Sequence, residues 1–231
     1  MKDTALPSPA SSRPYNAATR EISCTLGVLL GISSLSHGLP EILQGNQTTP
    51  GLIVKALGAG YRWTVWKQGS EPAFTLVPNF LLTGILASAI GLLMILCSIW
   101  LIQRPHGPAV FLLLAITSFL VGGGLAQVLL FSLNWALATR IHASLGFWRW
   151  LIPQPARRIM ARFWRWPLVA GSIFFLAALE IAIFGYIPGV PGERQILDRI
   201  LWQLAGAIVI SFLVSFLFGL AHDVEVRYEV R

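Results

Sequence analysis

The sequence predicts an all-α fold: a polytopic integral membrane helix bundle with four transmembrane helices and one shorter amino-terminal helix that is tilted or re-entrant. Only 12% of the 231 residues are charged, whereas soluble domains contain roughly 25%. A mean hydropathy of +0.67 also excludes a disordered chain, which requires low hydrophobicity and high net charge. Residues 72–103 and 107–139 contain no Asp, Glu, Lys or Arg, and each run is longer than the ~20 apolar residues that cross a bilayer.

The chain begins with a polar tail, residues 1–20, which is rich in Pro, Ser and Ala and is expected to be mobile. The transmembrane domain is expected to follow over residues 21–222. Its first apolar segment covers about 22–43, but the charge-free part, 22–36, is too short to require a full crossing. A signal peptide is the alternative interpretation of this start.

Small residues line one face of the first apolar segment. Gly27, Gly31, Ser34 and Gly38 are separated by four, three and four positions, which places them on one side of a helix. Such a face allows another helix to approach closely, although glycine is also common in membrane helices in general. Pro40 lacks a backbone donor, so a kink or the end of the helix is expected there.

The middle of the chain contains two long apolar segments. Residues 44–73, which include two tryptophans, predict an interfacial loop, and the second segment follows at 77–103. The third segment, 108–139, would measure about 48 Å as one helix, which exceeds the ~30 Å hydrocarbon core. Three consecutive glycines at 122–124 each weaken a helix by roughly 1 kcal/mol relative to Ala. A kink or break is therefore expected at these glycines.

Residues 147–166 form a basic amphipathic segment that is expected to lie in the headgroup layer. Three arginines recur at helical spacing on one face, beginning at Arg158, and three apolar residues recur on the next face, beginning at Ile159. An ordinary cytoplasmic loop is the alternative. The residues expected to contact the headgroups of anionic lipids are Arg149, Arg157, Arg158, Arg162, Arg165, Trp148 and Trp164.

The carboxyl-terminal part contains two further apolar segments, at 167–187 and 200–221. The final residues, 223–231, alternate polar and apolar side chains with period two. A strand could pair through such a pattern, but a nine-residue end is expected to be a mobile tail.

The charge distribution predicts a multipass protein of the cell membrane with residues 140–166 in the cytoplasm, because this segment carries six arginines and no acidic residue. Five full crossings would place the amino terminus outside. A first segment that does not cross would place both termini inside, and the positive-inside rule favours this arrangement. In both arrangements residues 44–73 lie on the same side of the membrane as the basic segment.

Five polar residues form the candidate intramembrane site. Glu180 is the only carboxylate well inside one of the four longer segments, where a charge costs ~2.5 to 3.5 kcal/mol at the bilayer centre. It is therefore expected to point into the bundle, with His37, Gln127 or Gln203 as its partner. His37 and Glu41 are four positions apart and would share a helical face near the membrane boundary. Structural hydrogen bonding is the alternative role for all of these groups.

The sequence contains no phosphate loop, zinc protease pair, nucleophile elbow or dinucleotide fingerprint, so an enzyme is not the preferred interpretation. No metal site and no cofactor are expected, because zinc normally requires at least three protein ligands. The net charge of +7 is concentrated beside predicted spans, which favours lipid over nucleic acid as the partner. The first hypothesis is a non-enzymatic structural or accessory membrane component that packs with itself or another membrane protein. The alternative is a small proton-coupled carrier that uses an intramembrane carboxylate.

Three stretches resemble a family of small bacterial multipass membrane proteins that has no assigned activity. They are HGLPEILQGN at residues 37–46, EPAFTLVPN at 71–79 and LVGGG at 120–124. The resemblance implies a membrane protein and its compartment, but it implies no activity.

Overall fold

The computed structural model describes residues 15–55, 72–185, 187–190 and 194–228, and these are mostly helical. The predicted loop over 44–73 and the predicted tail over 1–20 fall largely outside them. The elements in chain order are α1 (Ala17–Gln44), β1 (Ile53–Lys55), β2 (Pro72–Phe74), α2 (Phe80–Leu96), the π-helix η1 (Cys97–Leu101), α3 (Gly107–Leu120), α4 (Val128–Ala138), α5 (Gly146–Leu151), α6 (Gln154–Phe163), α7 (Arg165–Phe184) and α8 (Arg194–Tyr228).

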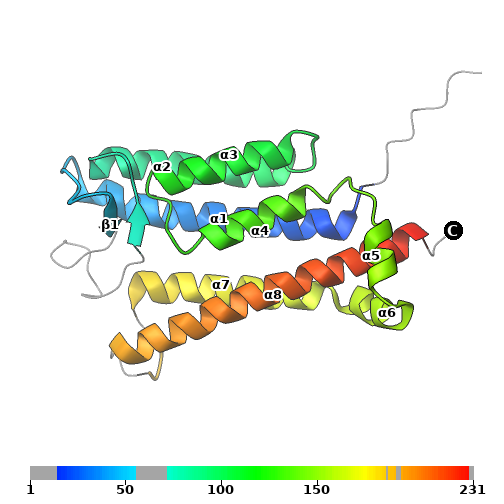
Figure 1. The fold of residues 1–231 in the computed structure, drawn as a ribbon. Helices are drawn as coiled ribbons and strands as arrows, with labels where there is room; N and C mark the ends of the chain where they lie inside the picture. Colours follow the sequence, from blue (N-terminus) through cyan, green and yellow to red (C-terminus); the bar gives the residue numbers. More distant parts are fainter. Residues whose placement is uncertain (1–14, 56–71, 186, 191–193, 229–231) are drawn as a thin grey trace, which may run out of the picture.

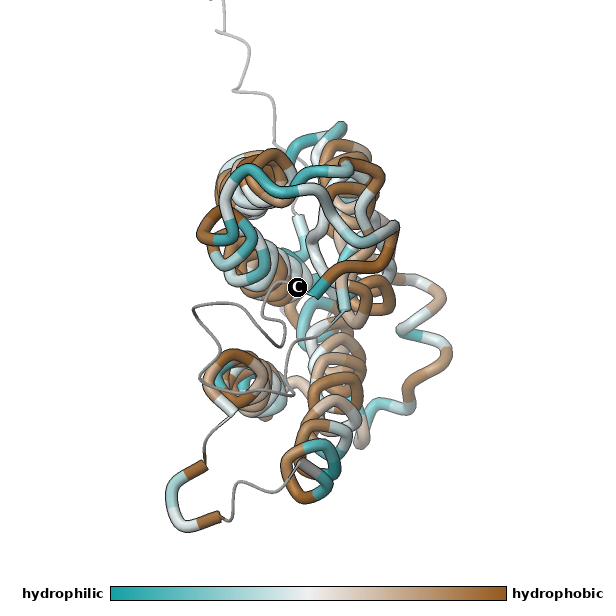
Figure 2. Tube along the Cα trace, turned by 90° about the vertical axis from the view of Figure 1, so that its left-hand side faces the viewer, coloured by the Kyte–Doolittle hydropathy of each residue, from teal (hydrophilic) through white to brown (hydrophobic). Residues whose placement is uncertain are grey.

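The long helices lie roughly side by side in two layers (Figure 1). One layer holds α1 to α4, and the other is the antiparallel pair α7 and α8, which contacts α1. Helices α5 and α6 lie where α1 begins and α8 ends, and we call this the basic end. The two short strands lie at the opposite end, which we call the hairpin end. Seen from the hairpin end, the helices carry mainly hydrophobic residues (Figure 2).

Four helices are long and apolar enough to cross a membrane, as the predicted class requires, but they are not the four expected from the sequence. They are Ala17–Gln44, Phe80–Leu101, Arg165–Phe184 and Gln195–Tyr228. The first apolar segment, expected to be short, is a helix of 28 residues, and it continues past Pro40 to Gln44. Its last turn packs directly on α2, because a Cβ built at Gly84 would lie 2.5 Å from the Ile42 nitrogen.

The third apolar segment is interrupted at the glycine triplet, which confirms the expected break, but it is not one crossing. Helices α3 and α4 run in opposite directions, since His142 beyond α4 contacts the carbonyl oxygen of Gln103 before α3 at 2.6 Å (Figure 1). At about 21 Å and 16 Å, each helix is shorter than the ~30 Å core. Gly122 and Gly124 adopt φ values of 99° and 95°, which other residues rarely adopt.

This reversal separates two segments that both expected arrangements placed on the same side. Because α1 runs the full length of the bundle and α4 turns back, β1 lies at the hairpin end and residues 140–164 lie at the basic end. The loop over 44–73 was expected beside the basic segment, and its described part lies opposite. The predicted tail also differs, because α8 remains helical to Tyr228 and Arg227 donates to the Ala143 carbonyl at 3.0 Å.

The predicted small-residue face of α1 is confirmed and packs against α2. A Cβ built at Gly31 would lie 2.6 Å from the Gly91 carbonyl oxygen, and one at Gly91 would lie 2.7 Å from that of Gly31. Gly38 and Gly84 form a second reciprocal pair, at 2.7 and 2.6 Å. Two pairs of glycines therefore bring the backbones of these helices into direct contact.

At its other end, α1 is held by Asp223 of α8. The carboxylate accepts hydrogen bonds from the backbone N–H groups of Ala18 and Thr19, both at 2.9 Å, and from the Thr19 hydroxyl at 2.7 Å. These donors belong to the first turn, which has no partner within its own helix. The side chain of the N-cap residue, Asn16, makes no such bond and instead donates to the Arg140 carbonyl at 2.6 Å.

The glycine contact between α1 and α2 predicts a position-specific effect of one methyl group. Gly31→Ala should reduce the free energy of unfolding by about 1–3 kcal/mol, because its Cβ collides with backbone and the helices must separate. Gly206→Ala on α8 is the matched control, since nothing lies within 4 Å of its Cβ position and Ala is the better helix former. Thermal unfolding in detergent compares the two variants, and equal stabilities would contradict the close contact.

Candidate functional site

Buried polar side chains gather between α1, α2 and the interruption that follows α3, towards the hairpin end. We call this cluster the Glu41 site. Its members are at most 6% exposed and comprise Ser33, Ser34, His37, Glu41, Thr75, Thr83, Ser118 and Gln127. Polar groups at such depth in an apolar bundle are costly unless they are hydrogen-bonded, so their partners decide what the site can do.

Glu41 is the central group of the site. Its side chain is fully buried, and neither carboxylate oxygen makes a hydrogen bond. The carboxylate lies against Gly122, whose Cβ would be 2.9 Å from Oε2 and 3.0 Å from Oε1. Thr83 occupies the same space from α2, because its methyl carbon would be 2.6 Å from that Cβ. Two features therefore favour glycine at position 122: its positive φ angle, and the carboxylate that occupies the space where a Cβ would lie.

His37 and Gln127 meet two residues further along the interruption. A Cβ at Gly124 would lie 2.8 Å from His37 Nε2 and 2.7 Å from Gln127 Nε2. Gln127 also donates to the Ser33 hydroxyl at 2.7 Å. His37 and Glu41 therefore share a face of α1, as their spacing predicts, and the chain reversal adds Gln127 to them.

The backbone of the interruption is paired with a strand. Strand β2 pairs with β1 on one side in an antiparallel register, and on its other side it meets residues 121–125. Gly122 donates to the Phe74 carbonyl at 2.9 Å, and Leu125 donates to the Pro72 carbonyl at 3.1 Å. Non-helical backbone within an apolar bundle is tolerated only where such partners exist.

The remaining polar groups around Glu41 are neutral hydroxyls that bond to one another. The Thr75 and Thr83 hydroxyl oxygens lie 3.0 Å apart, and Thr83 also donates to the Val77 carbonyl at 3.1 Å. A second pair joins Ser34 to Ser118 at 3.0 Å. Among the described residues, no Lys or Arg forms an ion pair with the Glu41 carboxylate.

The expectation that Glu180 points into the bundle is wrong. Glu180 is exposed on α7, and it makes no hydrogen bond or ion pair with the described residues. Its place on the helix explains this, because Ile173 and Phe184, which share its face at helical spacing, are also exposed, at 59% and 52%. Gln203 on α8 is exposed as well, so neither residue joins the Glu41 site.

The residues expected to contact lipid headgroups divide into two groups. Those that are exposed are Arg149, Arg158, Arg162 and Arg165. Trp164 and Arg157 are instead buried, at 5% and 4% exposure, and Trp148 is half-buried against Phe216. Trp164 packs beside His222 of α8, with ring centres 5.5 Å apart.

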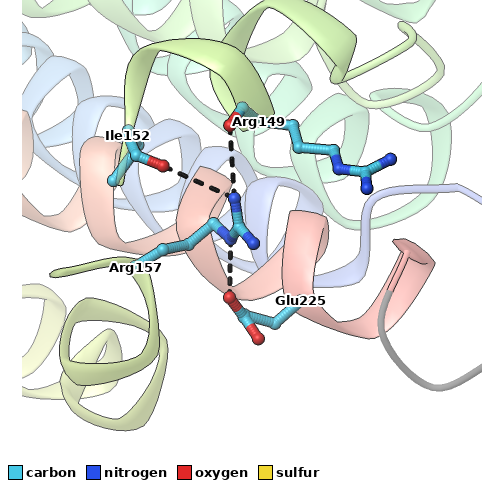
Figure 3. Close-up of polar contacts among 4 residues, drawn as sticks. All are labelled: Arg149, Ile152, Arg157 and Glu225. Atoms are coloured by element: carbon cyan, nitrogen blue, oxygen red, sulfur yellow. Dashed lines mark hydrogen bonds and ion pairs between the residues drawn. The ribbon is translucent and has the colours of Figure 1, made fainter. Parts of the chain in front are cut away.

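Arg157 is the clearest departure from its expected role. Its Nε donates to Glu225 Oε1 at 2.5 Å, and its Nη1 donates to the carbonyls of Arg149 and Ile152 at 3.2 and 3.4 Å (Figure 3). One guanidinium thus joins α6 to α8 and caps the carboxyl-terminal end of α5. Arg157 faces the protein although it directly precedes Arg158, which is exposed. The spacing of the arginines in the sequence did not distinguish these two positions.

No group of three or more His, Cys, Asp or Glu side chains that could hold a metal ion is found among the described residues. Comparison with protein-family models, characterised proteins and solved structures gives no match. The family suggested by the three sequence stretches therefore stays a prediction.

The contact between Gly122 and Glu41 predicts a large effect of Gly122→Ala. The variant should lose about 1–3 kcal/mol of stability from backbone strain and a further ~1–3 kcal/mol because the new methyl group collides with Glu41 and Thr83. Gly189→Ala separates the two causes, since Gly189 has a φ of 77° with nothing within 4 Å of its Cβ position. It should show the strain alone. Chemical unfolding in detergent that gave both variants the same loss would contradict the collision.

Proposed function

We propose that this protein is a multipass component of the cell membrane in which α1, α2 with η1, α7 and α8 cross the bilayer. The pair α3 and α4 enters from the basic end and turns back at residues 121–127. The four long apolar helices support the crossings, and the shortness of α3 and α4 supports the re-entrant pair. The carbonyl groups of β2 accept hydrogen bonds from Gly122 and Leu125, and so supply partners that the turn needs inside the protein.

We further propose that the basic end faces the cytoplasm. Nine of the twelve described Lys and Arg residues lie at this end, and the other three, Lys55, Arg194 and Arg199, lie at or near the hairpin end. The excess of positive residues in cytoplasmic loops supports this orientation. It places the Glu41 site near the outer boundary.

Cysteine labelling of intact cells tests the orientation. In a background with both native cysteines replaced by alanine, Ala156→Cys should resist an impermeant maleimide, whereas Gln195→Cys should react. Both positions are exposed, and they lie at opposite ends of the bundle. Equal labelling after lysis controls for reactivity. Labelling of residue 156 with protection of residue 195 would reverse the proposed orientation.

We propose that the protein acts as a small proton-coupled carrier, with Glu41 rather than Glu180 as its proton-binding group. The observation that carries this proposal is a fully buried carboxylate without a hydrogen-bond donor, placed against the interruption of a re-entrant helix pair. An ionised carboxylate there has no compensating interaction, so the group needs a bound proton or another cation.

The surrounding residues support movement of that proton. His37 lies one helical turn before Glu41 on the same face of α1, and its imidazole can accept and release a proton. Gln127 belongs to the interruption, where glycines allow the backbone to move more easily than a continuous helix would. Polar and ionisable groups inside membrane proteins commonly mark such pathways.

A structural or accessory role remains the competing function, and the glycine contacts of α1 and α2 favour it. In these contacts the small residues of α1 and α2 serve close helix packing. They do not account for Glu41, because burying a carboxylate without a partner costs desolvation free energy and adds no hydrogen bond between helices.

Infrared spectroscopy of the reconstituted protein tests whether Glu41 binds a proton. The wild-type protein should show the carbonyl band of a protonated buried carboxyl, and this band should be absent from Glu41→Gln. Glu180→Gln is the matched control and should keep the band, because Glu180 is exposed. A band that persists in Glu41→Gln, or that is absent from the wild-type protein at every pH, would remove the carrier proposal and leave the accessory role.

A further inference from the structure

The surface formed by residues 147–166 combines exposed cations with exposed aromatic and aliphatic side chains. Its cations are Arg149, Arg158, Arg162 and Arg165. Its apolar members are Phe147, Trp150, Ile159, Phe163 and Trp166, of which Trp150 is 80% and Trp166 71% exposed. No acidic residue occurs between residues 140 and 179. Arginines beside exposed aromatic and aliphatic side chains are typical of a helix that lies in the headgroup layer.

The cations and the apolar residues occupy separate stripes of α6. Arg157 and Trp164 face the protein, and the stripe that begins at Arg158 lies next to them. The stripe that begins at Ile159 lies beyond it, on the side turned away from the protein. Helix α6 thus presents positive charge beside a hydrophobic surface that no described residue covers.

The surface is held in a fixed position by buried contacts. Arg157 links α5, α6 and α8 through its bonds to Glu225 and to two carbonyls at the end of α5 (Figure 3). Arg149 lies over the Tyr228 ring at 5.1 Å, which adds a second contact with α8. Arg165 lies 3.9 Å from Glu21 of α1. That pair is highly exposed and contributes little.

The position of the surface identifies the partner. Helix α6 leads directly into α7, a helix that is long and apolar enough to cross the membrane, so the surface lies at a membrane boundary. Arginines and tryptophans meet at such a boundary where phosphate groups and acyl chains adjoin. A soluble acidic protein would match the arginines but would not cover the apolar stripe on their far side.

We propose that α5 and α6 form a binding surface for anionic phospholipids, with the arginines of α6 on the headgroup phosphate and the apolar stripe on the acyl chains. The proposal rests on the proposed membrane insertion and is independent of the Glu41 site. Its specificity is for net negative headgroups, because residues 147–166 offer donors and positive charge and include no acidic residue for the amine of a zwitterionic lipid.

Lipid retention by the full chain tests the surface. The protein is reconstituted in an equal mixture of phosphatidylglycerol and phosphatidylcholine, extracted in mild detergent, and analysed by native mass spectrometry. The wild-type protein should retain phosphatidylglycerol preferentially. Arg158→Gln with Arg162→Gln should lower the retained ratio by about fivefold for each arginine at low salt.

Arg104→Gln with Arg140→Gln is the matched control, because both residues are exposed at the same end and lie outside α5 and α6. This variant has the same net charge and should keep the wild-type ratio. An equal loss in both double variants, or no preference in the wild-type protein, would overturn the proposal. The proposal would also be overturned if the native mass spectrum showed a dimer and the residues of the apolar stripe were protected from chemical labelling. A second copy of the chain would then occupy the surface. None of these results depends on the infrared band of Glu41.

Discussion

The pairing between β2 and the glycine-rich interruption is the interaction on which the arrangement of this protein depends. Without the β2 carbonyls that accept from the N–H groups of Gly122 and Leu125, residues 121–125 could not remain non-helical inside an apolar bundle. With them, the chain reverses after α3, and α4 returns to the basic end. The reversal therefore sets which end receives α5, α6 and the start of α7, and it brings Gln127 to the side chains of α1.

Helix α1 is the element around which the two layers assemble. Near the hairpin end its glycines admit the α2 backbone, and at its first turn Asp223 supplies the acceptors that the helix lacks. Between these points the Ser23 hydroxyl donates to the Asn134 side chain of α4 at 2.9 Å. A side-chain hydrogen bond therefore also joins α1 to α4, which lies in the same layer. A helix with few charged residues and many small ones is suited to this central position, because close packing and not charge holds its neighbours.

Much of the fold follows from local sequence patterns, and what does not follow depends on long-range pairing. The apolar runs, the glycine face of α1 and the interruption at 122–124 are visible in the sequence because each reflects composition or spacing within one segment. Whether Gly122 and Gly124 produce a kink or a full reversal depends on β2, whose pairing partner lies some fifty residues away. The same limit applies to the site. His37 and Glu41 are found from their spacing on one helix, but Glu180 is the more conspicuous carboxylate. Its exposure depends on which face of α7 is turned away from the bundle, and only the packed structure shows this.

Three charged side chains are buried among the described residues, and the difference between their environments separates stabilising groups from a group with a function. Arg157 has Glu225 and two carbonyl oxygens, and Asp223 has two backbone N–H groups and a hydroxyl. Each of these joins separate helices, so its burial is offset by the bonds that it forms. Glu41 joins nothing, although it is the most deeply buried of the three. A carboxylate that forms no hydrogen bond in the folded protein and is nevertheless fully buried is best explained by a proton or cation that it binds there.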